Sequence, residues 1–189
     1  MNEKDMFMDG GEIYLRPPRR QDLEGNWYSW LNDQVVTKYQ DKGIFPNTQE
    51  EQEGYYNYIL KSKKDVIFAI CEKKTDKHIG AVGLHKINWI HRSAELGILI
   101  GEKDYWGKGY GKTAWNLITG YGFDVLNMHR IYAFIMYENI YSIKSAKSSG
   151  FKEIGRIKDT FYKNGKYHDA FLLNCIYSEY KPLKNIKKK

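Results

Sequence analysis

The segment that most constrains the fold is the glycine-rich stretch YWGKGYGKTAW, from Tyr105 to Trp115. It stands between a strand-like run at Ala94 to Ile100 and a helix-like run at Lys112 to Leu126, and another strand-like run, Arg130 to Met136, follows. A strand, a loop, a helix and a strand in this order form a crossover, so the two strands should be parallel. The glycines must then lie where the first strand passes into the helix.

Around this crossover the chain predicts antiparallel strands and further helices. Asn164-Gly165 separates two late strand-like runs, which is a strong hairpin signal. Thr48 and Glu51 form a capping box before one helix, and Gly150 stands where an αL residue would end another. The other predicted strands are Glu12 to Arg16, Val66 to Glu72, His78 to Lys86, Gly155 to Tyr162 and Tyr167 to Ile176, and the other predicted helices are Asp22 to Leu31, Gln49 to Ser62 and Tyr141 to Ser149.

Length and composition predict one α+β domain. A chain of 189 residues with 42% hydrophobic residues can bury one core, which we assign to residues 1–180, with a basic tail at 181–189. The net charge of +7 favours an anionic ligand, but five lysines lie in the tail, so nothing calls for a nucleic-acid partner. The sequence shows no membrane span, signal peptide, disulfide framework or metal motif, so we expect a cytoplasmic protein with buried Cys71 and Cys175.

The glycine-rich loop admits several interpretations. A Walker A loop ends in Gly-Lys-Thr as here, but its first glycine would fall on Trp106. The dinucleotide fingerprint matches Gly109, Gly111 and Ala114, but it should open the fold and be followed by an acidic residue about 20 positions on. An ordinary turn before a helix also remains open.

A fourth interpretation uses the backbone of the loop. N–H groups from Trp106 to Lys112 would converge at a helix N-terminus, where unpaired donors and a partial positive charge attract a pyrophosphate. Glycine lets the main chain adopt positive φ and approach the ligand, and Lys108 and Lys112 add charge.

The loop and the order of elements resemble the GNAT superfamily of acyl-CoA N-acyltransferases. The family's loop signature, Arg/Gln-x-x-Gly-x-Gly/Ala, is similar to WGKGYG at 106–111, with Trp106 departing from the usual first residue. The segments IYLRPPRRQDLEG, WLND, AELGILIGEKDYWGKGYG and FYKNGKYHDAFLL resemble, in order, the branch that holds ribosomal-protein and spermidine N-acetyltransferases. The resemblance implies a mixed, mostly antiparallel central sheet with helices on both faces and a parallel strand pair that splays into a wedge.

The resemblance also implies how acetyl-CoA, the expected co-substrate, is held. Backbone groups of the strand before the loop would pair with the pantetheine arm, a main-chain N–H there would serve the oxyanion, and Asn139 would hydrogen-bond the arm. The implied contacts are Ile98, Leu99, Ile100, Trp106, Gly107, Lys108, Gly109, Tyr110, Gly111, Lys112 and Asn139. No metal is implied.

Glu95 is the candidate general base. An alkylammonium has a pKa near ~10, so the neutral amine is scarce at pH 7, and a carboxylate near the wedge could accept its proton directly or through a water. Family members often carry a glutamate at this position, although Glu95 could also be an exposed residue at a strand end. Asp169 and Glu138 are the alternatives. The histidines His85, His91, His129 and His168 suit solvated or structural roles better.

Ser142 is the candidate for facing the sulfur, as an acid or as a thiol-orienting group. Asn139 and Ser142 form the branch's Asn-x-x-Ser block, but Asn139 could equally be a plain helix N-cap. Many members carry a tyrosine acid four residues after this serine, and here that residue is Ala146. A thiol of pKa ~8.5 is already a fair leaving group, so activity does not require that tyrosine.

The expected function is acetyl transfer from acetyl-CoA to a primary amine. The acceptors left open are a polyamine, an amino sugar, an amino-nucleotide sugar and a protein N-terminus, and a homodimer is compatible with the sequence. A non-catalytic acyl-CoA sensor is the alternative that Ala146 suggests. The aromatic residues expected to share core and acceptor-pocket roles are Trp27, Tyr28, Trp30, Tyr39 and Phe45.

Overall fold

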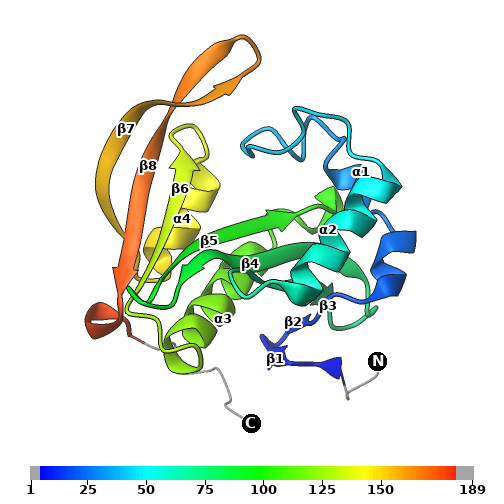
Figure 1. Cartoon of the computed structure of the whole chain (residues 1–189), viewed down its shortest axis with the longest axis horizontal. Coiled ribbons are helices and arrows are strands. Elements are labelled where there is room, and N and C mark those ends of the chain that lie inside the picture. The colour runs from blue at the N-terminus through cyan, green and yellow to red at the C-terminus, as the bar shows by residue number, and fades with distance from the viewer. Residues whose placement is uncertain (1–4, 182–189) are drawn as a thin grey trace.

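One eight-stranded mixed sheet runs through the molecule, and a computed structural model describes residues 5–181 (Figure 1). The strand order is β1-β2-β3-β4-β5-β6-β8-β7, and every neighbouring pair is antiparallel except β5 and β6. This confirms the α+β fold class. The strands are β1 (Met8–Asp9), β2 (Ile13–Arg16), β3 (Val66–Glu72), β4 (His78–Asn88), β5 (Ser93–Ile100), β6 (Arg130–Met136), β7 (Lys152–Lys163) and β8 (Lys166–Ile176).

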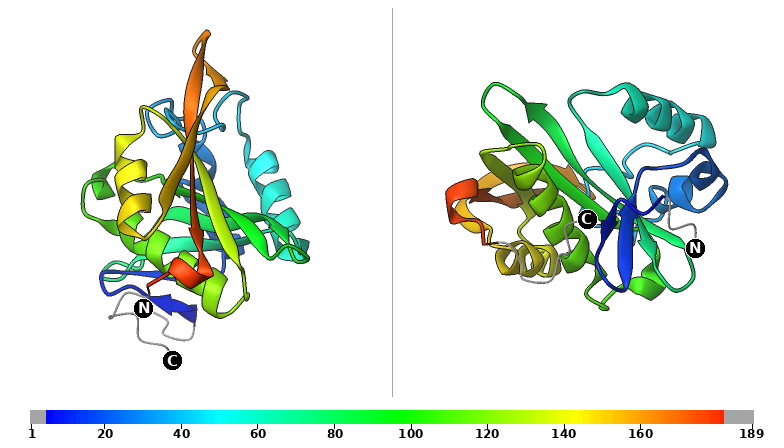
Figure 2. Two further views of the ribbon diagram at one scale, coloured as in Figure 1. Left: turned by 90° about the vertical axis from the view of Figure 1, so that its left-hand side faces the viewer. Right: turned by 90° about the horizontal axis from the view of Figure 1, so that it is seen from below.

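Helices cover both faces of the sheet (Figure 2). The larger core lies under α3 and α4, and a second cluster around Trp27 and Trp30 lies on the opposite face, where Leu99 of β5 packs against it. The α-helices are α1 (Trp27–Trp30), α2 (Gln49–Lys61), α3 (Tyr110–Asp124) and α4 (Ile140–Ser148), and short 3₁₀ turns are η2 (Arg20–Glu24), η3 (Lys103–Tyr105) and η4 (Tyr177–Glu179).

The parallel pair is short, and this shapes the site. β5 and β6 are in register only where Ser93, Ala94 and Glu95 face Arg130, Ile131 and Tyr132. Beyond these residues the strands diverge, and β6 instead continues along β8. The splayed strand pair expected from the sequence is therefore confirmed, and the wedge opens directly after Glu95.

Two element predictions were wrong. The helix predicted over Asp22 to Leu31 is the 3₁₀ turn η2 followed by the single turn α1, because Gly25 and Asn26 interrupt it. The edge strand β1 was not anticipated, because two residues carry no readable alternation.

Local signals read from the sequence are otherwise confirmed. Thr48 Oγ1 accepts from the Glu51 backbone N–H at 3.1 Å, and Gly150 adopts φ +89° behind α4. Asn164 and Gly165 both have positive φ, the two-residue turn that matches strand twist. Gly122 is needed inside α3 because an added Cβ would lie 2.6 Å from Ile131 of the sheet.

Some predictions fall partly outside what the structure describes. Of the basic tail at 181–189, residues 182–189 lie outside the described residues. Both cysteines are buried free thiols, as expected. Within residues 5–181, no helix is long and apolar enough to cross a membrane, and no three metal-ligating side chains cluster.

Candidate active site

The glycine-rich loop presents unpaired backbone donors at the start of α3. Gly107 and Gly109 have φ of +75° and +83°, and an added Cβ at either would meet nothing within 4 Å. These positions therefore need glycine for backbone conformation rather than for space. Within residues 5–181 the N–H groups from Gly107 to Lys112 have no hydrogen-bond partner, and the first helical bond runs from Thr113 N–H to Gly109 at 3.0 Å. Such a cradle fits a pyrophosphate.

The wedge edge of β5 can be identified from its hydrogen bonds. Gly101 donates its N–H to Ile79 at 2.9 Å, on the β4 side. Backbone groups alternate along a strand, so Leu99 also faces β4, whereas Ile98 and Ile100 face the wedge. Of the three residues expected to pair with a pantetheine arm, Ile98 and Ile100 are therefore the two whose backbone groups are turned toward it.

Two side chains from outside β5 donate hydrogen bonds to its wedge-facing carbonyl oxygens. Gln40 Nε2 donates to the Ile98 oxygen at 3.2 Å, and Trp106 Nε1 donates to the Ile100 oxygen at 2.8 Å. The sequence had assigned Trp106 only a backbone role. Its indole instead supplies the hydrogen bond that holds the loop against the end of β5. Gln40 carried no sequence signal because it lies in a segment without periodicity.

Glu95 lies at the apex of the wedge. It faces His85 of β4 and Tyr132 of β6, and it is the last β5 residue paired with β6. Ala94 and Leu96 on either side point into the core under α3, so Glu95 points to the opposite face, on the side of α1 and α2. Its side chain is 22% exposed, so it is more sheltered than the exposed strand-end glutamate that remained open from the sequence.

A lysine ammonium already contacts this carboxylate. Lys86 Nζ lies 2.8 Å from Glu95 Oε2, while the lysine side chain is 73% exposed. The hydrogen bond that Lys86 donates to Glu95 is the main cause that raises the pKa of Lys86, and the Coulombic effects of Glu95, Tyr132 and Asp41 add to it. Two carboxylates, Glu95 and Asp41, thus act on one alkylammonium at the apex of the wedge.

Asn139 and Ser142 lie at the start of α4, beyond the end of β6. Asn139 Oδ1 accepts from the Ser142 backbone N–H at 3.2 Å, so the N-cap role is observed. Ser142 is partly exposed, and its hydroxyl makes no hydrogen bond to another residue of the described chain. Ala146 is fully buried in the core, so the position of the usual tyrosine is filled by packing.

The alternative acids and bases are engaged in ion pairs elsewhere. Glu138 pairs with His168 at 2.9 Å, and Asp169 pairs with Arg156 at 2.6 Å. His85 lies across from Glu95, but its Nδ1 faces Asp65 at 3.2 Å. Glu95 is also ion-paired, with Lys86, but among the three candidate carboxylates it is the one that lies where β5 and β6 diverge.

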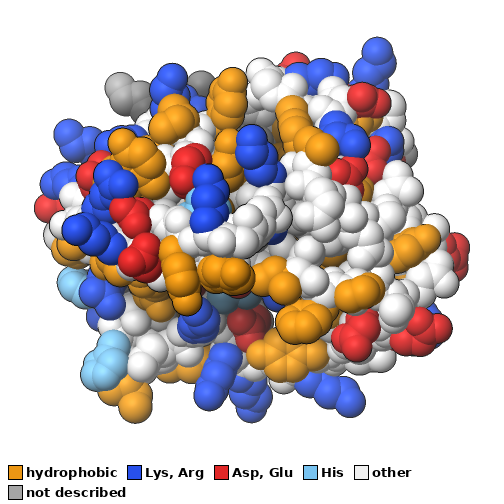
Figure 3. All heavy atoms as spheres, turned by 90° about the horizontal axis from the view of Figure 1, so that it is seen from above, with side chains coloured by type: hydrophobic (Ala, Val, Ile, Leu, Met, Phe, Trp, Pro, Cys, Tyr) orange, Lys and Arg blue, Asp and Glu red, His pale blue; other side chains and the backbone are white. Residues whose placement is uncertain are grey.

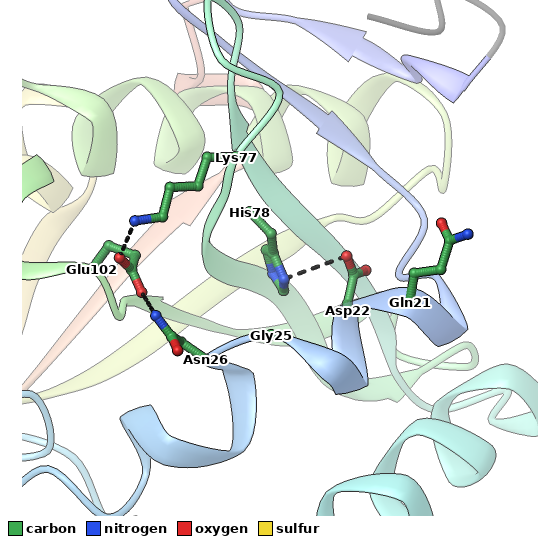
Figure 4. A pocket seen from close by; sticks show the side chains of 7 residues that line it. All are labelled: Gln21, Asp22, Gly25, Asn26, Lys77, His78 and Glu102. Atoms are coloured by element: carbon green, nitrogen blue, oxygen red, sulfur yellow. Dashed lines mark hydrogen bonds and ion pairs between the residues drawn. The ribbon is translucent and has the colours of Figure 1, made fainter.

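A small polar cavity of about 220 Å³ lies at the start of β4 (Figure 4). His78 points toward Asp22 there, and Glu102 binds Lys77 and Asn26. Ligand sites usually occupy about 300–1,000 Å³. The charged groups of this cavity are already paired: Asp22 with Arg16, and Glu102 with Lys77, so these contacts fasten η2 and α1 to the neighbouring strand ends.

The predicted aromatic residues divide between packing and exposure. Trp27 and Trp30 are buried, and both rings contact His78 edge-on. An added Cβ on Gly101 would lie 1.9 Å from the Trp30 ring, so this tryptophan packs directly on the backbone after β5. Phe45 is 82% exposed, which leaves it no core role.

Comparison with known proteins agrees with this geometry. Residues 12–152 match the model of the acetyltransferase (GNAT) domain. The chain belongs to the GNAT acetyltransferase family. It is therefore an N-acetyltransferase of the family that uses acetyl-CoA, which excludes the Walker A and dinucleotide interpretations of the loop.

Similar GNAT proteins include spermidine acetyltransferases. The spermidine N(1)-acetyltransferase of Vibrio cholerae is 34% identical over 131 residues, which cover 69% of this chain and 75% of that one. The enzyme of that name from Escherichia coli K12 is 30% identical over 165 residues, covering 87% and 86%. A crystal structure of the Vibrio cholerae enzyme in complex with CoA and spermine has a TM-score of 0.82 and 30% identity, covering 89% of this chain and 98% of that one.

Proposed function

We propose that this GNAT protein transfers the acetyl group of acetyl-CoA to a primary amine at the end of a linear, polyamine-like molecule. The observation that carries the proposal is the contact of Lys86 Nζ with Glu95 at 2.8 Å. A lysine side chain ends in a primary alkylammonium, so the site already accommodates that group beside the proposed base. The names of the similar Vibrio cholerae and Escherichia coli proteins support the same acceptor class.

Acetyl-CoA would be held by the backbone of the chain. The free N–H groups at Gly107 to Lys112 fit its pyrophosphate, and Ile98 and Ile100 turn backbone groups toward the pantetheine path. Lys108 in the loop and Lys112 in the first turn of α3 add positive charge that favours the anion. Trp106 would give up the Ile100 carbonyl where the arm requires it, while Gln40 keeps its hydrogen bond to the Ile98 carbonyl.

Acetyl-CoA supplies an activated thioester, and residues of the wedge would do the rest. Glu95 accepts the proton of the attacking amine, directly or through a water. The wedge-facing N–H of Ile98 donates to the carbonyl oxygen as it gains negative charge. Ser142 gives a proton to the departing sulfur or orients it.

Incubation with acetyl-CoA and a panel of amines, with thiol release as the readout, tests the function. We expect turnover on linear diamines and polyamines, and Glu95→Gln should lower kcat/KM by about 10²–10³-fold, within the usual range of general base catalysis. The loss should shrink at high pH, where the free amine is abundant. The affinity for CoA should not change.

Two other outcomes would redirect the proposal. CoA binding without turnover on any amine, together with indifference to Glu95→Gln, would indicate a sensor. Turnover on amino sugars, amino-nucleotide sugars or peptide N-termini, with none on polyamines, would keep the acetyltransferase and replace the acceptor. The expected cytoplasmic location and homodimer stay predictions.

A further inference from the structure

A buried lysine at the tip of the β7–β8 hairpin holds a distant loop. Lys163 is only 6% exposed, and its Nζ donates to the backbone oxygens of Thr37, Gln40 and Lys42 at 2.6, 2.9 and 3.0 Å. An ammonium has three donors, and all three are used. We call residues 37–42 the roof segment, because of where this latch places them.

The roof segment reaches the other side of the wedge through Gln40. Its side chain donates to the Ile98 oxygen of β5 at 3.2 Å. Lys163 belongs to β7, which in the sheet lies beyond β6 and β8. A segment that contacts both β5 and the β7–β8 turn must cross the opening between β5 and β6. Figures 1 and 2 show this loop, after α1, extending to the tip of the hairpin.

The roof segment lies on the same side of the sheet as the proposed base. It joins α1 to α2, and these helices cover the face toward which Glu95 points. Asp41 of the roof acts electrostatically on Lys86, the partner of Glu95. Seen from above, this end of the molecule carries a band of hydrophobic side chains with Lys and Arg on both sides of it (Figure 3).

The three hydrogen bonds of Lys163 fix the conformation of the roof segment. Burying an ammonium costs several kcal/mol unless it is fully hydrogen-bonded, and an apolar side chain could fill the same space without that cost. What the ammonium adds is a fixed conformation for three carbonyls of one loop. At the base of the roof, Thr37 is fully buried, and its Oγ1 donates to the Asp33 oxygen at 2.9 Å.

We propose that the roof segment, latched by Lys163 and anchored to β5 by Gln40, encloses the acceptor side of the wedge and admits only slender, unbranched amines. Lys163 is then a positioning residue that sets acceptor specificity through residues 37–42. The inference rests on the proposed function, and it adds that an amine on a folded protein surface is excluded by shape.

Lys163→Met tests the latch against Lys166→Met, a lysine that is exposed and lies directly across the same turn. Each variant removes one lysine from the hairpin. Trypsin should cleave the roof after the exposed residues Lys38 and Lys42 about tenfold faster in Lys163→Met, because a released loop opens more often. Cleavage in Lys166→Met should match the unsubstituted protein.

The specificity readout is the ratio of kcat/KM for spermidine to that for the N-terminal amine of a small folded protein. We expect this ratio to fall about tenfold or more in Lys163→Met, and to stay in Lys166→Met, with CoA affinity unchanged in both. If Lys163→Met does not fold, Gln40→Leu keeps the latch and removes the β5 anchor, and the ratio should fall in the same way.

An unchanged ratio in Lys163→Met and in Gln40→Leu overturns the specificity role, even where trypsin cleavage is faster. Equal cleavage rates in the two lysine variants overturn the latch itself. The failure of the proposed function looks different: no amine is acetylated by the unsubstituted protein, while the trypsin comparison still decides whether Lys163 holds the roof.

Discussion

At the scale of single residues, the contact between Glu95 and Lys86 joins the chemistry to the acceptor. Glu95 is sheltered, and Lys86 is mostly exposed. Under the proposed function, an acceptor ammonium that binds Glu95 would have to displace the lysine, so Lys86 would compete with the substrate for the carboxylate.

Removal of this competitor should strengthen acceptor binding. Exposed ion pairs contribute about 0.2–1 kcal/mol, so Lys86→Met should lower the KM for a linear amine by up to about fivefold, with little change in CoA affinity. Initial-rate kinetics at saturating acetyl-CoA measure this. A raised KM would show instead that Lys86 helps to bind the acceptor. Lys63→Met, a change at an exposed lysine that only lends its backbone oxygen to Trp89, is the control.

His78 predicts how stability depends on pH. Burial lowers the pKa of this imidazole to about 4, and the charge of Arg16 acts in the same direction. The folded pKa lies below the ordinary value of about 6.5, so the unfolded chain binds the proton more tightly. Stability from neutral His78 is therefore complete above pH ~6.5 and is lost as the pH falls toward 4, by up to about 3 kcal/mol.

Urea denaturation between pH 4 and 7 tests this, with His78→Gln as the comparison. The variant should be less stable at pH 7, but its stability should fall less on acidification. The carboxyl of Asp22 does not confuse the result. Although burial opposes it, the hydrogen bond from Arg16 lowers the pKa of Asp22, so its contribution is lost only below the ordinary value near 3.8. A parallel decline in both proteins would contradict the assignment.

At the scale of elements, the loop before α3 depends on backbone conformation. Gly109 holds φ +83° as the N-cap, and an L-residue there costs about 1–2 kcal/mol. Gly109→Ala should therefore lower Tm by about 2–8 °C for a domain of this size and weaken CoA binding.

Gly54→Ala is the matched control for that change. Gly54 lies within α2, and an added Cβ there also meets nothing within 4 Å. Alanine in a helix interior is favoured over glycine by about 1 kcal/mol, so this variant should raise Tm. Calorimetry should thus show shifts of opposite sign from the same chemical substitution. Equal shifts would mean that the loop does not need its left-handed glycines.

Elements were predictable where the signal was local. The hairpin at Asn164-Gly165 and the end of α4 at Gly150 depend on residues that accept positive φ, and such residues are visible in the sequence. The helix expected over Asp22 to Leu31 is interrupted at Gly25 and Asn26, and tertiary contacts then hold the separate turn α1: Trp30 packs on Gly101, and its indole donates to Glu102 at 2.9 Å.

The positions of the candidate site residues in the fold were predictable to the same extent, whereas their roles stay predictions. The loop and Glu95 lie in segments with clear patterns, and both are found at the wedge. Gln40 and Lys163 were missed because their partners are backbone oxygens of residues 58 and 121–126 positions away. A sequence shows side chains, and it does not show which distant carbonyl one of them will reach.

At the scale of the whole molecule, the eight-stranded sheet consists of two halves that are joined by the short pairing of β5 with β6, which we call the seam. β1 to β5 form one half, and β6, β8 and β7 form the other, with only Ser93 to Glu95 paired to Arg130 to Tyr132 between them. The roof segment adds a second link through Gln40 and Lys163. A ligand lying in the wedge would add a third link, on the open side of the seam.

Binding of acetyl-CoA should therefore protect both halves together. At a ligand concentration of 100 Kd, mass action alone stabilises the fold by about 2.7 kcal/mol, which corresponds to a Tm increase of about 5–11 °C. Hydrogen exchange distinguishes a ligand that links the two halves of the sheet from a ligand that binds only at the loop before α3. Amides of β6 and β8 should slow with those of β5 and the loop, because opening the seam now requires release of the ligand. Slowing confined to residues 106–112 would show that the ligand binds at the loop without joining the halves, and the wedge between β5 and β6 would then lose its assignment as the path of the pantetheine arm.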